Sequence, residues 1–232
     1  MKVALLHALP LDERMWEPQR GVLGDRELVV PNLYELGGSS VDGWARRILD
    51  EVDGDLAVVG ASMGGYVALA MARYAPERIR GLLLAGARPD ADSPERRAAR
   101  ADSIRLIEER GAEGAWENQR EKLFAGDPPP GAREIALERD PEELVRAVEA
   151  LRDRADSSDV VRSLQVPVVF AVGAGDVFFP VEEARAFADE TPFGSLVVFD
   201  RSSHLPNLEQ PAEFNETLLE LLQRLSQPSA NT

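Results

Sequence analysis

The chain has 232 residues, of which 26 are basic and 41 acidic, so its net charge is −15. That length suffices for one α/β domain with a substantial core. The negative charge repels phosphate backbones and anionic lipid head groups, so nucleic acid and membrane surfaces are disfavoured as partners. There is no cysteine, which excludes disulfides, thiolate metal sites and thiol nucleophiles and fits the reducing cytoplasm in which we expect the protein.

No segment of the sequence resembles a targeting or membrane-spanning segment. The N-terminus enters an apolar run without the basic region or cleavage site of a signal peptide. The longest uncharged stretch, residues 56–72, is interrupted by Gly60, Ser62, Gly64 and Gly65. This punctuation favours a buried strand, a sharp turn and a buried helix over a membrane span.

Six short apolar runs, most of them without polar alternation, have the pattern of strands covered on both faces. They are Val3 to His7, Glu27 to Val30, Leu56 to Gly60, Gly81 to Ala85, Val166 to Val172 and Ser195 to Phe199.

Segments with helical spacing lie between these runs. One apolar stripe begins at Val41, with Ser39 or Ser40 placed to cap it, and another follows Pro211 at a first helical position. Alternating strands and helices predict a mainly parallel sheet of about six strands with helices on both faces.

The interval from Gly86 to Gln165 departs from this alternation because it contains helical patterns and no convincing strand. We expect one helix to start at Ser93-Pro94 and stop at Gly111, and another to start at Asp140 with Glu143 completing a capping box. Pro128-Pro129-Pro130-Gly131 predicts a loop between helical pieces. The sequence therefore predicts a core domain of residues 1–86 and 166–232, with residues 87–165 inserted as a helical lid.

The strongest local signal is Gly60-Ala61-Ser62-Met63-Gly64-Gly65, between an apolar strand and an apolar helix. Small residues flank a serine in this way where the backbone turns so tightly that larger side chains would clash. Such a turn exposes the serine hydroxyl at the edge of the sheet. A glycine-rich turn with a capping serine is the alternative, but the context favours Ser62 as a nucleophile.

A serine needs a base, and a histidine base needs an orienting acid. The chain has two histidines. His204 follows the last predicted strand, where a base is expected when a serine after an early strand comes first along the chain and the acid comes between them. Asp176 follows the penultimate strand in Val172-Gly173-Ala174-Gly175-Asp176 and is the expected acid. Asp200, four residues before His204, is the second candidate.

These motifs together make the chain resemble the α/β-hydrolase family along nearly its whole length, most closely its small esterase and lactonase branch, which includes proteins similar to 3-oxoadipate enol-lactonase. The matching segments are His7-Ala8-Leu9-Pro10, the turn at Ser62, Gly173-x-x-Asp176-x-x-x-Pro180, and His204 followed by Glu209-Gln210-Pro211. Relatives commonly have two strands before the one that starts here at Val3, so we expect a shortened sheet with the first strand near its centre.

The resemblance also implies an oxyanion hole formed by the backbone amides of Leu9 and Met63. The family usually has glycine where this chain has Ala8, which bears on the path of that loop. His7 is expected to be structural. Candidate substrate-pocket residues are apolar and come from both the insertion and the core: Trp116, Leu123, Phe124, Phe178, Phe179 and Leu205.

The resulting hypothesis is a serine hydrolase that cleaves a small carboxylic ester or lactone through an acyl-enzyme, with no metal or organic cofactor. Two alternatives remain open at this point. One is a C–C bond hydrolase or lyase of the same fold, and the other is a weakly catalytic ligand-binding receptor. The sequence does not specify an oligomeric state.

Overall fold

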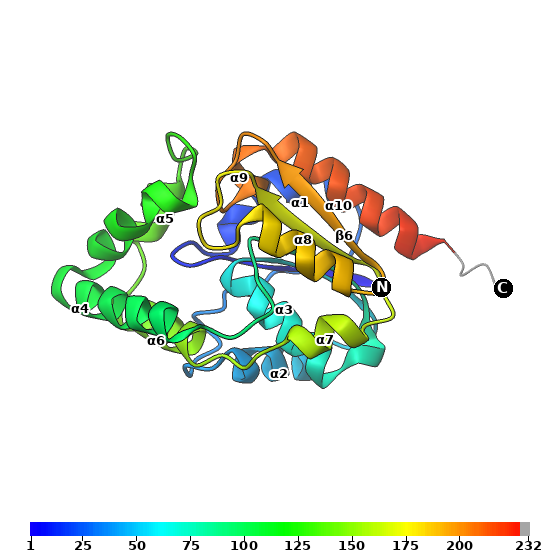
Figure 1. Cartoon of the computed structure of the whole chain (residues 1–232), viewed down its shortest axis with the longest axis horizontal. Helices are drawn as coiled ribbons and strands as arrows, with labels where there is room; N and C mark the ends of the chain where they lie inside the picture. The colour runs from blue at the N-terminus through cyan, green and yellow to red at the C-terminus, as the bar shows by residue number, and fades with distance from the viewer. Residues whose placement is uncertain (228–232) are drawn as a thin grey trace.

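The computed structural model describes residues 1–227 and contains one six-stranded, all-parallel sheet with helices around it (Figure 1). The strands are β1 (Lys2–Leu6), β2 (Leu28–Val29), β3 (Leu56–Ala61), β4 (Ile79–Ala85), β5 (Val168–Gly173) and β6 (Gly194–Phe199), in the spatial order β2-β1-β3-β4-β5-β6. All six apolar runs are therefore strands, and the predicted fold class is confirmed.

The position of the first strand was predicted wrongly. β1 lies second from the edge, between β2 and β3, and the centre of the sheet is formed by β3 and β4. The short strand β2 pairs with β1 through only two residues, Leu28 and Val29. Within residues 1–227 no further strand pairs beyond β2, so β1 lies close to one edge.

Helices cover both faces of the sheet because alternate side chains of each strand point to opposite sides. On one face the strands pack against α2 (Val41–Glu51), α3 (Met63–Tyr74) and α8 (Val181–Glu190). On the other they pack against α1 (Glu17–Leu23) and α10 (Pro211–Ser226). Ser40 caps α2 by accepting a hydrogen bond from the Gly43 amide, as the sequence indicated.

Four helices lie between β4 and β5: α4 (Pro94–Leu123), α5 (Ala132–Leu137), α6 (Pro141–Arg152) and α7 (Ser158–Ser163). We call residues 87–165 the inserted segment. Among the described residues it contributes no strand, as predicted. Asp140 caps α6 by accepting a hydrogen bond from the Glu142 amide at 2.7 Å. Within residues 1–227 the Glu143 carboxylate accepts no hydrogen bond from the Asp140 amide, so the predicted capping box is not completed.

Helix α4 is divided into two arms at Gly111, whose φ of 61° and ψ of −150° are not helical. After this residue the chain turns back, so that residues 94–110 and 112–123 lie side by side. Asn118 on the second arm donates to Ser103 on the first at 3.3 Å, and Arg110 pairs with Glu117 at 2.6 Å. The predicted stop at Gly111 is thus the turn of a helical hairpin.

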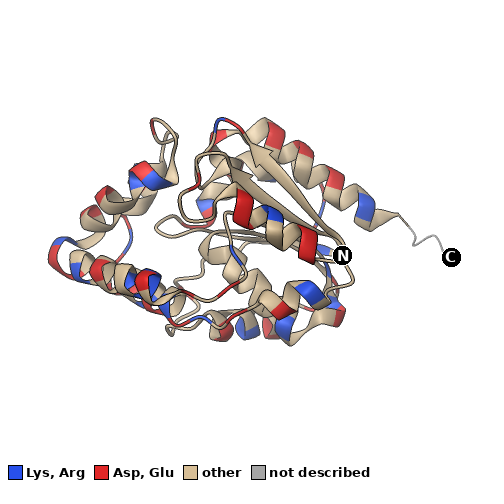
Figure 2. Cartoon of the chain, viewed as in Figure 1, with Lys and Arg blue, Asp and Glu red and all other residues tan. Residues whose placement is uncertain are grey.

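Charged side chains lie mainly on the helices, and the strands carry few (Figure 2). Both signs alternate along α4 and α6, so the inserted segment is not uniformly acidic although the chain as a whole is. Within residues 1–227, no helix combines the length and the apolar character needed to span a bilayer.

The remaining helices are short. The 3-10 helices Glu13–Trp16 and Pro76–Arg78 lie before α1 and before β4, and α9 (Pro206–Glu209) follows the loop that carries His204.

Candidate active site

Ser62 lies at the carboxyl end of β3, in the tight turn that leads into α3. Its φ of 47° and ψ of −109° make it the one non-glycine residue with positive φ among residues 1–227. A Cβ atom on Gly60 would lie 2.4 Å from the Gly64 carbonyl oxygen, and one on Gly64 would lie 2.0 Å from the Leu6 oxygen. The small residues around Ser62 are therefore required by the close approach of β1, β3 and α3, and the turn stores backbone strain at the serine.

The three residues predicted to form the catalytic group converge in space. His204 Nε2 lies 2.8 Å from Ser62 Oγ, and His204 Nδ1 lies 2.8 Å from Asp176 Oδ2. Asp200, the second candidate acid, is exposed and has no contact with His204. The imidazole thus bridges one hydroxyl and one carboxylate that are more than a hundred residues apart in the chain.

Two backbone amides that follow Asp176 in its own loop hold its side chain in place. Its Oδ1 atom accepts hydrogen bonds from the amides of Phe178 at 2.8 Å and Phe179 at 3.1 Å, which leaves Oδ2 for the imidazole. Because an ionised carboxylate only accepts, His204 Nδ1 must carry the proton in this contact. Nε2 of neutral His204 is then free to accept a proton from Ser62.

Two glycines, Gly86 and Gly173, make room for His204, a role that the sequence motifs did not indicate. Gly86, with φ of 60°, directly follows β4, and a Cβ there would lie 2.8 Å from both Nδ1 and Cε1 of the imidazole. Gly173 ends β5, and a Cβ there would lie 2.0 Å from the Ser203 carbonyl oxygen. Both positions require glycine because the histidine loop lies against the ends of these strands.

Glu209, which belongs to the Glu-Gln-Pro motif after His204, holds the loop that carries this histidine. One of its carboxylate oxygens accepts from the Ser203 amide and from Ser202 Oγ, each at 2.8 Å, and the other accepts from the Ala125 amide at 2.6 Å. Glu209 therefore joins the loop before His204 to the end of α4. The Glu-Gln-Pro motif was the available signal, but its partners are distant in sequence.

The two amides predicted to form the oxyanion hole come from different elements. Leu9 lies in the loop after β1, and Met63 is the first residue of α3. Within the described part of the chain, neither amide donates a hydrogen bond to a protein acceptor. Ala8 is not among the residues with positive φ, and its amide donates to Met15 Sδ at 3.2 Å, so the loop accommodates alanine without left-handed backbone.

His7 is fully buried and does not contact Ser62. Its Nε2 accepts a hydrogen bond from the Leu33 amide at 2.8 Å, and its ring packs against Tyr34 at 5.0 Å between centroids. Burial lowers the pKa of His7 to about 4, so its imidazole is neutral near pH 7. These contacts support the structural role that the resemblance implied.

The loop after His7 is also attached to the inserted segment through Asp12. Its carboxylate pairs with Arg14 at 2.8 Å and with Arg139, in the turn between α5 and α6, at 3.3 Å. Burial acts to raise the pKa of Asp12, but the hydrogen bonds from Arg14 and the charge of Arg139 outweigh it and leave that pKa below its ordinary value. The path of this loop therefore depends on ionic contacts with the inserted segment.

The six candidate pocket residues occupy different places. Phe178 lines an open cavity, described below, and packs edge-on against His204 with 4.7 Å between ring centroids. Phe179 points into the core instead, against Phe170. The other four are buried in the apolar cluster on the opposite side of the sheet: Trp116, Leu123, Phe124 and Leu205.

The described residues include no group of three or more histidine, aspartate or glutamate side chains that could hold a metal ion. The groups that the structure brings together at Ser62 are a hydroxyl, an imidazole and a carboxylate.

Residues 3–217 match the sequence profile of the alpha/beta hydrolase family, which covers most of the chain and agrees with the sheet and with the turn at Ser62. The chain belongs to the alpha/beta hydrolase family. Among its sequence relatives is a pimeloyl-[acyl-carrier protein] methyl ester esterase from Klebsiella pneumoniae, 26% identical over 96% of this chain and 94% of the relative. Another is a putative carbamate hydrolase from Pseudomonas savastanoi, 27% identical over 71% of this chain and 66% of the relative.

Solved structures of other alpha/beta hydrolases superpose closely. A thermophilic esterase from Thermogutta terrifontis, determined with malate bound, has a TM-score of 0.88 and 29% identity, with 98% of this chain and 91% of that chain covered. An enol-lactonase from Burkholderia xenovorans has a TM-score of 0.83 and covers 95% of this chain and 90% of its own, but its 22% identity supports the fold alone. This alpha/beta hydrolase thus has esterases among its relatives, as the resemblance implied.

Proposed function

We propose that this protein is a serine hydrolase that cleaves a small carboxylic ester or lactone, with Ser62 as nucleophile, His204 as general base and Asp176 as the orienting acid. The observation that carries the proposal is the pair of 2.8 Å contacts that His204 makes, one with Ser62 and one with Asp176. A serine hydroxyl becomes an effective nucleophile only when a neighbouring base takes its proton. The relatives named above as esterases support the ester as substrate class.

In the proposed reaction, Ser62 Oγ attacks the acyl carbon while its proton moves to His204 Nε2. The negative charge that develops on the acyl oxygen is stabilised by the amides of Leu9 and Met63, each worth about 3 to 4 kcal/mol in the transition state. The imidazolium then protonates the departing alcohol, which leaves an acyl-enzyme at Ser62. Water attacks that ester with His204 again as base, which releases the acid and restores the hydroxyl.

The inserted segment, residues 87–165, forms a lid in this proposal. Its α4 ends at Leu123, whose carbonyl oxygen accepts a hydrogen bond from the His204 amide at 3.2 Å. A substrate bound at Ser62 therefore meets the inserted helices on one side of the imidazole and the core on the other.

The test is covalent labelling by a fluorophosphonate combined with turnover of p-nitrophenyl and methyl esters. We expect labelling and turnover in the wild type and neither in Ser62→Ala. Asp176→Asn should lower kcat by about 10⁴-fold, because the imidazole loses the correct tautomer. Asp200→Asn removes the exposed aspartate and serves as the matched control, with turnover close to that of the wild type.

Each alternative function predicts a different result. One relative is named as a 2-hydroxy-6-oxononadienedioate hydrolase and is 26% identical over 72% of this chain and 62% of the relative. We therefore also propose a test for carbon–carbon bond cleavage. Efficient turnover of β-diketones without turnover of any ester would overturn the ester proposal. Labelling of Ser62 without turnover of either class would instead favour a ligand-binding receptor.

A further inference from the structure

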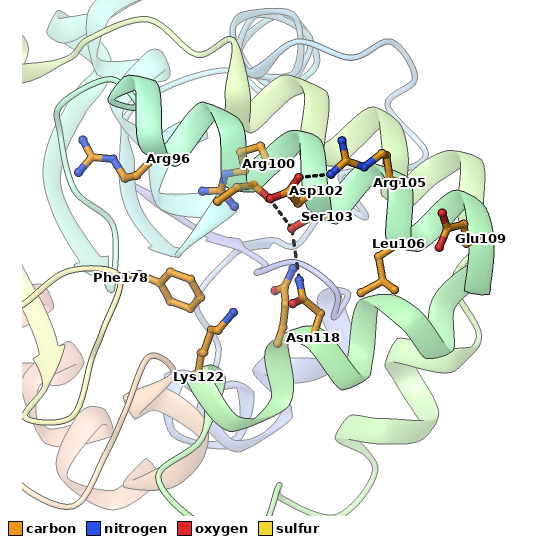
Figure 3. A pocket seen from close by; sticks show the side chains of 12 residues that line it. Arg96, Arg100, Asp102, Ser103, Arg105, Leu106, Glu109, Asn118, Lys122 and Phe178 are labelled. Atoms are coloured by element: carbon orange, nitrogen blue, oxygen red, sulfur yellow. Dashed lines mark hydrogen bonds and ion pairs between the residues drawn. The ribbon is translucent and has the colours of Figure 1, made fainter.

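A cavity of about 510 Å³ opens between the two arms of α4 and the loop that follows β5 (Figure 3). Its walls combine polar and apolar side chains from both arms, and Phe178 closes the end nearest the core. The residues that line it are Arg96, Ala99, Arg100, Asp102, Ser103, Arg105, Leu106, Glu109, Asn118, Gln119, Lys122 and Phe178. A volume of this size accommodates a small organic molecule.

The cavity lies next to His204. The ring of Phe178, which forms one of its walls, packs edge-on against the His204 imidazole at 4.7 Å. Lys122 forms another wall, and its carbonyl oxygen accepts a hydrogen bond from Ser203 Oγ at 2.7 Å. Phe178 thus lies between the cavity and His204, and a substrate whose ester group sits at Ser62 reaches the cavity with its far end only by passing the ring of Phe178.

The end of the cavity near Phe178 is cationic. Lys122 Nζ has no ion-pair or hydrogen-bond partner within residues 1–227, and Figure 3 shows its side chain beside Phe178. Arg100 contacts Asp92 only through Nε, at 3.2 Å, so its terminal nitrogens stay available. Two carboxylates also line the cavity: Glu109 lies at its far end, and Asp102 forms an ion pair with Arg105.

These two cations belong to a chain that is acidic as a whole. With a net charge of −15, the protein as a whole repels anions, and long-range attraction cannot favour an anionic substrate. Only local donors can do so, and a hydrogen bond between an ammonium or guanidinium group and a carboxylate is among the stronger polar contacts.

We propose that this cavity binds the carboxylate of a substrate that is both an ester and an acid, such as the monoester of a dicarboxylic acid, with Lys122 and Arg100 as the groups that hold the anion. The inference rests on the proposed ester hydrolysis at Ser62 and adds the substrate class. In the competing interpretation, Lys122 only faces water in the last turn of α4, where a cation is favoured by the helix dipole. That interpretation predicts no dependence on the charge of the substrate.

The experiment compares kcat/KM for esters that differ only in carrying a carboxylate. Monomethyl succinate, glutarate and adipate are paired with methyl butanoate, pentanoate and hexanoate, and methanol release is measured. A second anionic probe, 3-acetoxypropanoate against propyl acetate, places the carboxylate on the alcohol side and shows which end of the substrate enters the cavity. We expect the wild type to prefer the anionic member of at least one pair.

Lys122→Met should lower that anionic-to-neutral ratio about 10-fold or more, and Lys122→Glu should lower it further. The matched control is Arg120→Met, which removes one positive charge from the same turn of α4 at a residue that does not line this cavity. We expect it to leave the ratio unchanged. A ratio that Lys122→Met does not move, or that Arg120→Met lowers equally, would overturn the inference.

The two proposals fail in different ways. If Ser62→Ala abolishes turnover of neutral methyl esters but the ratio is insensitive to Lys122, the hydrolase proposal stands and the cavity proposal fails. If no ester is hydrolysed, binding of monomethyl glutarate to Ser62→Ala, measured by calorimetry with and without Lys122→Met, tests the cavity alone. Binding weakened about 10-fold by the second substitution supports the site, and equal binding overturns it.

Discussion

Gly86 offers a sharp test of how the fold positions its imidazole. Replacement by alanine puts a Cβ 2.7 Å from the His204 carbonyl oxygen and 2.8 Å from the Nδ1 and Cε1 atoms of its ring. Ordinary carbon contacts require about 3.5 to 4 Å, so the ring or its loop must move by roughly 1 Å. The contacts at risk are the two that define the site, from His204 to Ser62 and to Asp176.

The expected result for Gly86→Ala is a fall in kcat/KM of about 100-fold, because a displacement of that size in a catalytic group costs about two orders of magnitude. Alanine at φ of 60° also costs about 1–2 kcal/mol of backbone energy, which urea unfolding measures separately. Initial rates on a methyl ester, with the folded fraction fixed by circular dichroism, give the catalytic effect.

The matched control is Gly24→Ala. Gly24 has φ of 59°, almost the same as Gly86, but a Cβ there meets nothing within 4 Å. We expect it to lower the free energy of unfolding, because alanine is strained at this positive φ, without lowering kcat/KM. Equal activity in the two variants would refute the reasoning, since the strain would then be shared and the steric contact with His204 would have no effect.

Two further predictions concern buried polar groups. The pKa of His7 is about 4 in the folded protein and 6.5 in a free imidazole. As the pH falls, His7 of the unfolded chain is therefore protonated before His7 of the folded protein. The resulting stability is complete above pH 6.5 and is lost as the pH falls toward 4, by about 3 kcal/mol in total. Urea unfolding of His7→Gln at pH 7 and pH 4.5 should show a smaller loss than the wild type, and an equal loss would assign the effect to other groups. Glu209→Gln keeps the size of the side chain but weakens its hydrogen bonds to Ser203 and Ala125. We therefore expect kcat/KM to fall about 10-fold with the far-ultraviolet circular dichroism spectrum unchanged. An unaffected rate would show that these bonds do not position His204.

The local signals in the sequence were sufficient for the strands and for the turn at Ser62. Each depends on a few consecutive residues, such as the uninterrupted apolar run from Leu56 and the glycines on either side of the serine. The position of β1 in the sheet cannot be predicted from a few consecutive residues, because it depends on how many strands lie beyond β2. A family pattern with additional strands therefore placed β1 too near the centre of the sheet.

The residues that surround the site were harder to predict because their partners are remote. Gly86 and Gly173 look like ordinary strand-end glycines until the histidine loop is placed against them. Likewise, the stop at Gly111 was visible in the sequence, but the return of the second arm beside the first was not. The cavity between the arms exists only because of that return, so no periodicity within α4 could indicate it.

The same contacts link the base to the wall of the cavity. The His204 amide donates to the Leu123 carbonyl, and Glu209 joins Ser203 to the Ala125 amide, so the end of α4 and the histidine loop are held as one unit. A displacement of this end of the inserted segment would break bonds that fix the imidazole. If the inserted segment opens as the proposed lid, an intact Ser62–His204 contact requires that the first arm, residues 94–110, moves while the end of the second arm stays in place. In the proposed hydrolase, substrate then enters beside Lys122 without displacing His204.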